Sequence, residues 1–268
     1  MDAKHIVRWT PKHLLLLCLC CCGSQLTAQE DAAKPPTITL TPAVIMVKAK
    51  PGQSFSQELT LWNNTINELQ FHLDAVDVVV RDGRRVFVPA GELEGSIARY
   101  AVFTDNDVKA LPGSSVSTTV TVTVPTSPGP RAIACIFQGK TVMGTTNSFA
   151  MTASLGSLVT FTVGDDFHLE NQPLQVSVDP DAKMITFHEL VKNTGSDPVI
   201  PKGVIAVTNE RGALVARMPV AGKRLLPGES MEFTADHPGL PKTGKYKVML
   251  LMQHESAFFS SSAEFSVK

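Results

Sequence analysis

The sequence lacks an excess of positive charge and is poor in aromatic residues, which make up 6% of it. Its 268 residues include 24 Lys and Arg against 25 Asp and Glu, which leaves a net charge of −1. Because nucleic-acid binding depends on clustered Lys and Arg, this balance excludes that class of function. With 43% apolar and 18% charged residues, the chain is neither disordered nor a coiled coil. A globular protein remains, of a length that fits two domains better than one.

Cysteine is nearly absent outside the first 28 residues. Lys4, Arg8 and Lys12 precede a short apolar run, and Ala28 follows it as a small residue suited to cleavage. Four of the five cysteines lie in that run: Cys18, Cys20, Cys21 and Cys22. This order is typical of a secretory signal peptide, and the run is too short to span a bilayer. We expect cleavage near Ala28; a lipid anchor on a leader cysteine and a retained anchor are the alternatives.

After cleavage the chain keeps one thiol and a net charge of −3, because three basic residues and one acidic residue leave with the leader. Cys135 lies in an apolar run, which predicts a buried core thiol rather than a nucleophile. A single cysteine also excludes an intramolecular disulfide. No later stretch is apolar and long enough to form a transmembrane segment. We therefore expect an exported protein, in the periplasm or at the cell surface.

The dominant hydrophobic period along the chain is two. Residues 116–124 alternate Val with Ser and Thr, and residues 55–61 and 174–178 alternate in the same way. Such alternation is typical of half-buried strands. Turn signals such as Pro51-Gly52 and Pro112-Gly113 separate the strands. One short helical turn is expected between Glu92 and Tyr100.

This pattern predicts an all-β protein of two tandem immunoglobulin-like antiparallel β-sandwiches after an N-terminal signal peptide. The expected boundary is Gly164-Asp165, where a closing strand ends and a new set of strands begins. The predicted organisation is a signal peptide (1–28), a flexible leader (29–35), a first sandwich (36–164) and a second sandwich (165–268). The connector is so short that we expect a restricted angle between the sandwiches.

Several short motifs resemble functional sites but lack other residues that those sites require. Leu240-Pro241-Lys242-Thr243-Gly244 spells a sortase substrate without a hydrophobic tail, and Gly139-Lys140-Thr141 lacks the earlier glycine of a phosphate loop. His188-Glu189 begins like a zinc-protease helix but has Lys192 in place of the second His. Asp105-Asn106-Asp107 lacks the glycine and closing Glu of a calcium loop. We therefore predict no catalytic residue, no cofactor and no metal site.

The strand and turn segments resemble bacterial extracytoplasmic immunoglobulin-like domains. One set resembles the opening strands of two such groups, the N-terminal domains of periplasmic pilus chaperones and the peptidoglycan-binding domain of WxL-interacting surface proteins: residues 37–42, Pro51-Gly52-Gln53-Ser54 and residues 61–65. Another set is similar to the WxL-interacting surface proteins: residues 111–125, residues 128–137, Asn193-Thr194-Gly195, residues 208–212, Leu226-Pro227-Gly228 and Gly244-Lys245-Tyr246. The similarity covers most of the chain after the leader, but its motifs are turn and strand chemistry and specify the fold more than the function. The chain departs from both groups, because it has no membrane-spanning C-terminal segment and no Arg/Lys pair that can be placed as a subunit anchor.

One charged cluster is a candidate partner site. Arg81, Arg84 and Arg85 surround an Asp82-Gly83 turn, and they offer bidentate hydrogen bonds to carboxylates or an acidic polymer. The alternative interpretation is that these arginines have no partner and serve only to keep the turn soluble.

The sequence therefore predicts a protein-interaction or cell-envelope-binding module, and a chaperone or assembly factor for surface structures is one form of it. Its expected partner is another envelope or surface protein, or cell-wall polymer. Unpaired sheet edges are the general means by which such domains bind. Two alternatives stay open: a hydrolase or carbohydrate-active enzyme whose site assembles only in the fold, and a passive spacer.

Overall fold

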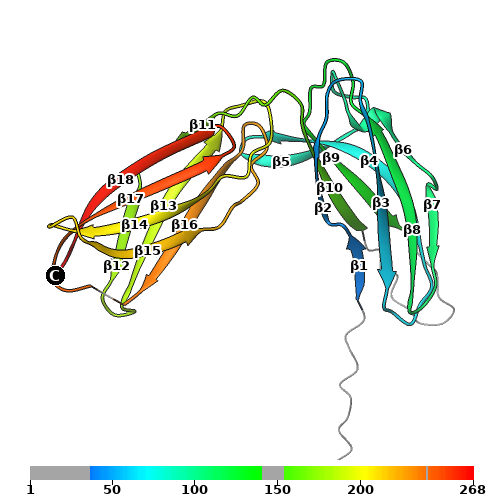
Figure 1. The fold of residues 1–268 in the computed structure, drawn as a ribbon. Coiled ribbons are helices and arrows are strands. Elements are labelled where there is room, and N and C mark those ends of the chain that lie inside the picture. The colour runs from blue at the N-terminus through cyan, green and yellow to red at the C-terminus, as the bar shows by residue number, and fades with distance from the viewer. Residues whose placement is uncertain (1–36, 141–153, 240) are drawn as a thin grey trace, which may run out of the picture. The chain divides into compact units, whose positions relative to one another are not determined.

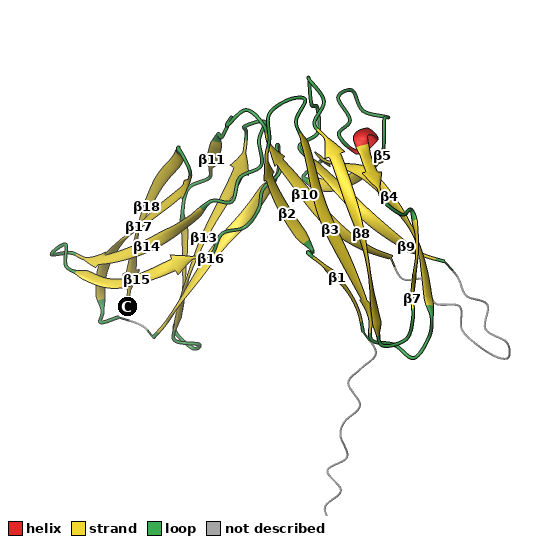
Figure 2. Cartoon of the chain, turned by 45° about the vertical axis from the view of Figure 1, so that its right-hand side comes forward, coloured by secondary structure: helices red, strands yellow, loops and turns green. Residues whose placement is uncertain are grey.

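The computed structural model describes residues 37–140, 154–239 and 241–268, and these residues form an all-β protein (Figures 1 and 2). The predicted signal peptide (1–28) and leader (29–35) lie outside the described residues. No helix in the described ranges is long and apolar enough to cross a membrane. The helical turn expected between Glu92 and Tyr100 is a single 3-10 helix, η1 (Ala98–Tyr100), shown in red in Figure 2.

Strands β1 to β10 form the first sandwich, which has two sheets. One sheet has the order β1-β3-β8-β6, and the other has the order β2-β10-β9-β4-β5 with β7 on β4. The strands are β1 (Ile38–Thr41), β2 (Val44–Lys48), β3 (Ser54–Asn63), β4 (Leu69–Arg81), β5 (Arg84–Pro89), β6 (Ala101–Phe103), β7 (Asp107–Ala110), β8 (Ser114–Thr123), β9 (Ala132–Gly139) and β10 (Ser154–Thr162). Buried Phe71, Phe137 and Phe161 fill the space between these sheets.

Strands β11 to β18 form the second sandwich. In one sheet β13 pairs with β16 on one side and with β11 and β12 on the other, and the second sheet has the order β15-β14-β17-β18. The strands are β11 (Leu169–Asn171), β12 (Gln175–Asp179), β13 (Met184–Asn193), β14 (Lys202–Asn209), β15 (Leu214–Val220), β16 (Ser230–Pro238), β17 (Gly244–His254) and β18 (Ala257–Val267). Phe187, Ile205 and Leu250 belong to its separate core.

The predicted two-sandwich class is confirmed, with one difference in strand direction. β2 runs parallel to β10, with Val44 opposite Leu158 and Lys48 opposite Thr162. All other strand pairs in the described residues are antiparallel. The chain leaves one sheet after β1 and joins the other as β2, so its second segment runs beside the last strand of the sandwich. Alternation alone carries no information about such a change of sheet.

The Pro-Gly pairs form turns, as the sequence predicts. Gly52, Gly113 and Gly228 have positive φ angles of 79°, 67° and 77°, so the three Pro-Gly pairs use the conformation that glycine tolerates. The proposed boundary at residues 164 and 165 falls between β10 and β11. The division into two domains stays a proposal, because residues 36–268 form one contact unit.

Candidate functional site

An apolar surface covers the outer face of the β2-β10-β9-β4-β5 sheet. Strands in a sheet expose alternate residues to opposite faces, so a half-buried strand needs apolar residues on one face only. Residues 132–137 and 76–80 break this rule, because they are almost wholly apolar. The face turned away from the core is therefore apolar as well. We call it the apolar face: Val44, Met46, Val76, Val78, Phe87, Ala132, Ala134, Ile136 and Leu158.

Part of the apolar face is covered and part is exposed. Val78, Ala132 and Ala134 are buried in a small cluster with Leu226 from the second sandwich. In contrast, Met46 is 65% exposed, Phe87 60% and Val44 47%. Contiguous exposed apolar surface of this kind marks interaction sites on soluble proteins.

A sheet edge lies open beside the apolar face. β9 pairs with β10 along residues 154–160, but β2 reaches only residues 158–162 of β10 on the other side. Residues 154–157 therefore have no strand partner on that side among the described residues. The change of sheet before β2 leaves this gap, and the Ser157 hydroxyl donates a hydrogen bond to the Pro42 carbonyl at its end (2.7 Å). Unpaired backbone groups at an edge are a template for a further strand.

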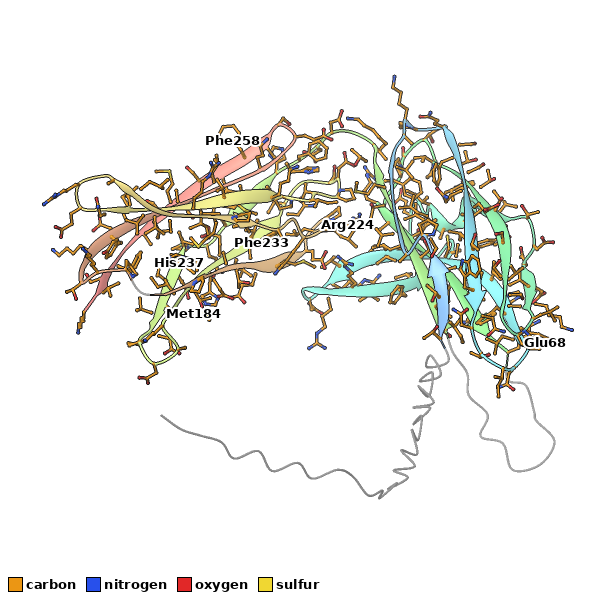
Figure 3. The ribbon with its side chains drawn as sticks, turned by 60° about the horizontal axis from the view of Figure 1, so that its bottom comes forward. Glu68, Met184, Arg224, Phe233, His237 and Phe258 are labelled. Atoms are coloured by element: carbon orange, nitrogen blue, oxygen red, sulfur yellow. The ribbon has the colours of Figure 1, made fainter. Side chains whose placement is uncertain are left out.

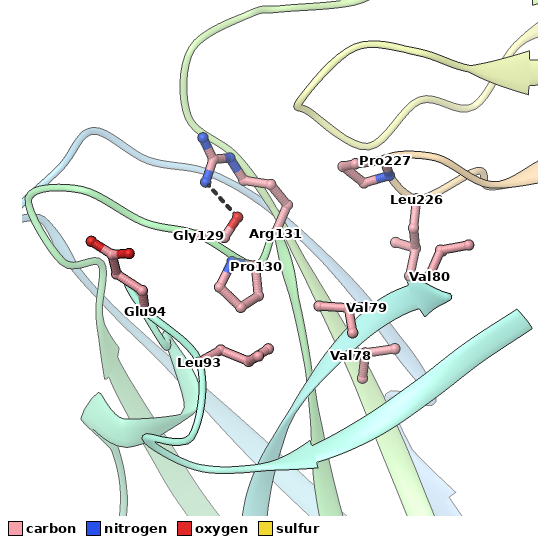
Figure 4. Close-up of a pocket in the computed structure, with 10 residues that line it drawn as sticks. All are labelled: Val78, Val79, Val80, Leu93, Glu94, Gly129, Pro130, Arg131, Leu226 and Pro227. Atoms are coloured by element: carbon pink, nitrogen blue, oxygen red, sulfur yellow. Dashed lines mark hydrogen bonds between the residues drawn. The ribbon is translucent and has the colours of Figure 1, made fainter. Parts of the chain in front are cut away.

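A cavity of about 310 Å³ lies at one end of the apolar face (Figure 4). Val78, Val80, Pro130 and Leu226 contribute apolar walls. Arg131 stands at the rim, and its Nε donates to the Asp197 carboxylate at 3.1 Å. That carboxylate is fully buried and also accepts the backbone N–H groups of Val163, Gly164 and Asp166. Buried carboxylates need such donors, so Asp197 holds the connector between the sandwiches.

The three predicted partner-binding arginines have different surroundings. Arg81 and Arg84 face each other at the end of the β4–β5 hairpin and are exposed. Arg85 forms a two-pronged ion pair with Glu229, at 2.9 Å and 3.0 Å, and donates to the Arg224 carbonyl. The Arg85 guanidinium is therefore occupied within the chain, while Arg81 and Arg84 are available to a partner. Partner binding by the three arginines stays a prediction.

Arg224 lines a second cavity of about 240 Å³ together with Thr160, His254 and Glu255. Arg224 is labelled in Figure 3, and its Nε is buried without a hydrogen-bond partner among the described residues. Burial and, to a lesser degree, the neighbouring Arg85 lower the pKa of Arg224. Burial likewise lowers the pKa of His254. Burial thus favours the neutral form of His254, and the partly desolvated Arg224 cation shares the cavity with the Glu255 carboxylate.

Other sequence predictions can be placed directly. Cys135 is fully buried in the first core, and burial raises its pKa to about 12, so the prediction of a buried core thiol is confirmed. His188 and Glu189 lie on strand β13, so the apparent zinc-protease motif is not helical. The described residues contain no group of three or more His, Cys, Asp or Glu placed to hold a metal ion. Thr141 and Leu240 of two further motifs lie outside the described residues.

The apolar face and the open edge were not predicted as a site from the sequence. The signal was present in residues 76–80 and 132–137, where both strand faces are apolar. Such a run predicts cover on both sides of a sheet. Which side lacks that cover depends on strand order, and strand order is a property of the fold.

Neither a family model nor a curated protein matches the chain. Among solved structures, the fold is similar to the class 5 fimbriae chaperone CfaA, with 13% identity and a TM-score of 0.44 over 87% of this chain and 99% of that one. A pre-assembly complex of CsuC and CsuE from Csu pili of Acinetobacter baumannii shows 12% identity and a TM-score of 0.40, over 85% of this chain and 97% of that one. The Salmonella enterica complex of SafA pilin with the SafB chaperone shows 11% identity and a TM-score of 0.40, over 88% of this chain and 98% of that one.

Each of these three structures contains a pilus or fimbrial chaperone, and pilus chaperones are one of the two groups that the sequence resembles. Similarity at this level of identity carries no functional conclusion.

Proposed function

We propose that this chain is an exported, non-enzymatic chaperone or assembly factor that binds an extended segment of an envelope or surface protein. The observation that supports the proposal is the open edge at residues 154–157 of β10, which ends beside exposed Val44, with exposed Met46 two residues further along β2. A strand added to that edge gains main-chain hydrogen bonds, and its alternate side chains pack on the apolar face. Affinity thus comes from the backbone and selectivity from apolar side chains.

This mode of binding suits a partner that is itself incomplete. An envelope subunit with an uncovered apolar strand face is prone to aggregate, because apolar surface and unpaired edges drive association. Contact with the apolar face keeps such a subunit soluble until it is assembled. A wall polysaccharide offers neither backbone amides for an edge nor apolar side chains, and the short peptides of a cell wall offer no row of large apolar side chains, so we expect a protein partner.

The test compares two matched methionine variants. Met46 lies on the apolar face and Met249 on the outer face of the β15-β14-β17-β18 sheet, with exposed fractions of 65% and 51%. The wild-type protein, Met46→Glu and Met249→Glu are used to capture partners from an envelope extract, and the retained protein is identified and quantified. We expect Met46→Glu to reduce retention at least about tenfold, because it places a carboxylate in an apolar contact. Met249→Glu should retain the wild-type amount.

Hydrogen exchange on the captured complex locates the contact. Among residues 154–157, the backbone amides that point away from β9 should become protected when the partner is bound. Equal retention by both variants would contradict the proposal, as would a wild-type protein that retains wall fragments alone.

A further inference from the structure

Strand β18 forms an edge of the second sandwich, and nothing in its sequence protects that edge. Among the described residues it pairs only with β17 (Figure 1). Every second residue of an edge strand directs its N–H and C=O away from the sheet. Edges that avoid further pairing carry Pro, Lys, bulges or inward charges. The eleven residues of β18 contain no Pro, Lys or Arg and one acidic residue, Glu264.

The inner side chains of β18 are incompletely covered. Phe259, Ser261, Ala263 and Phe265 face the core and are all partly exposed. The inner residues of neighbouring β17 are buried: Tyr246, Val248, Leu250 and Met252. The apolar row of β18 therefore lacks a neighbour on its free side, where a further strand would supply one.

We infer that β18 pairs antiparallel with β18 of a second copy of this chain. The register that overlaps all eleven residues is centred on Ser262, which then lies opposite itself on a two-fold axis. In this register Phe259 lies opposite Phe265 of the second copy, and both face the core side of the sheet. Glu264 lies opposite Ser260, so no like charges meet. The strand is thus self-complementary in the one register that pairs its whole length.

A two-fold pairing of this kind is closed, since each copy uses the same edge and no free edge is left at the contact. It joins the two β15-β14-β17-β18 sheets into one continuous sheet. Phe258, which is 75% exposed on the outer face (Figure 3), lies opposite Ser266 of the second copy. The contact uses the second sandwich and leaves the apolar face of the first sandwich free, so it is independent of the proposed function.

A disulfide on the two-fold axis tests the register directly. Residues opposite each other in an antiparallel pair have Cα atoms about 4.5–5.5 Å apart, which lies within the range that a disulfide spans. Ser262→Cys, purified after export and exposed to oxidised glutathione, should form a covalent dimer on a non-reducing gel. Cys135 does not interfere, because it is buried and burial raises its pKa to about 12. Ser177→Cys is the matched control, since Ser177 is an exposed serine on β12, an edge of the opposite sheet.

Sedimentation equilibrium then measures the dimer without a covalent link. Ser262→Glu places two carboxylates on the axis, and we expect it to raise the dissociation constant of the dimer at least about tenfold. An equal mixture of Ser262→Glu and Ser262→Lys should restore association through a heterodimer. This restoration also shows that both variants are folded.

The outcomes separate the possible occupants of the edge. A wild-type protein that stays monomeric at every concentration, or a Ser262→Cys protein that cross-links no better than Ser177→Cys, overturns the inference. A monomer whose β18 amides become protected only in a complex with a different protein also overturns it and assigns the edge to that partner. Dimers that dissociate in Ser262→Glu and re-form in the mixture support it.

Discussion

Both sandwiches expose apolar side chains, but they arrange them differently. On the first sandwich, Val44 and Met46 continue across neighbouring strands into Leu158 and Ala134, which makes one contiguous apolar surface. On the second, exposed Met249 and Leu251 lie on one face of β17, but Ser262 and Ser260 of β18 lie opposite them and separate them from the open edge. The exposed fractions of single residues are similar on the two faces, with 65% for Met46 and 51% for Met249.

The difference shows that exposure of single apolar residues does not define a site. Scattered apolar residues are normal on a protein surface, whereas a contiguous patch beside an unpaired edge is not. The two open edges differ in the same way. The edge of β10 adjoins large apolar side chains and suits an extended apolar segment, while serine-rich β18 is complementary chiefly to itself.

Each sandwich also has its own core, and truncating one large side chain in each provides the strongest test of their independence. Phe161 and Phe187 are both fully buried, in the first and second cores respectively. Phe161→Ala and Phe187→Ala should each lower the free energy of unfolding by about 3–5 kcal/mol, from lost burial and a residual cavity. If the sandwiches unfold separately, calorimetry resolves two transitions and each variant shifts only its own. One shared transition shifted by both variants would refute the division at residues 164 and 165.

A second, smaller effect distinguishes the arginines of the β4–β5 hairpin. Arg85→Ala leaves the Glu229 carboxylate, whose side chain is 6% exposed, without its ion-pair partner. Because the Arg85 side chain is itself 31% exposed, we expect a loss of about 2 kcal/mol in denaturant unfolding, below the range for a fully buried pair. Arg84→Ala should change stability by less than about 0.5 kcal/mol. Equal losses in the two variants would contradict these separate roles.

The same hairpin also tests the sequence-based prediction of partner binding. Arg81→Ala combined with Arg84→Ala should weaken retention of the protein on an immobilised acidic polymer at low salt and leave its unfolding midpoint unchanged. Retention unaffected by this double substitution would leave the two arginines as residues that only keep the turn soluble.

Local features of the fold were predictable because their causes are local. Val and Thr alternate through residues 116–124, and β8 (Ser114–Thr123) covers nearly all of that segment. Pro51-Gly52 and Pro112-Gly113 mark turns because glycine tolerates the positive φ that they adopt. The predicted hairpin around Asp82-Gly83 is confirmed by the pairing of Arg81 with Arg84.

The candidate site was not predictable because it depends on distant segments. Glu229 lies 144 residues from Arg85 in the sequence, and no sequence pattern near either residue predicts their ion pair. The open edge exists because β2 begins where it does, beside a strand more than one hundred residues away. Such features follow from strand order, which hydrophobic alternation does not determine.

The smallest expected effect concerns Glu189, a buried carboxyl group that links the second sandwich's open edge to the opposite sheet. Its Oε2 accepts a hydrogen bond from Ser261 on β18 (2.9 Å), and its Oε1 accepts one from Asn171 on β11 (2.7 Å). Burial raises the pKa of Glu189, and these two hydrogen bonds offset only part of the shift. A raised pKa in the folded state favours the protonated form, so this contribution to stability is full at low pH and is lost as the pH rises through the folded-state pKa.

Glu189→Gln keeps the shape and both hydrogen bonds without the charge. We expect the variant to match the wild type near pH 3 and to be more stable at pH 7, by less than about 1.5 kcal/mol, the scale of one hydrogen bond. Urea midpoints at the two pH values measure the difference, with Glu170→Gln, at an exposed position on β11, as the control. A stability difference between Glu189→Gln and the wild type that is the same at both pH values would show that the Glu189 charge is not what weakens the open edge. A difference that appears only at pH 7 would show that ionised Glu189 destabilises the side of the second sandwich where β18 is open.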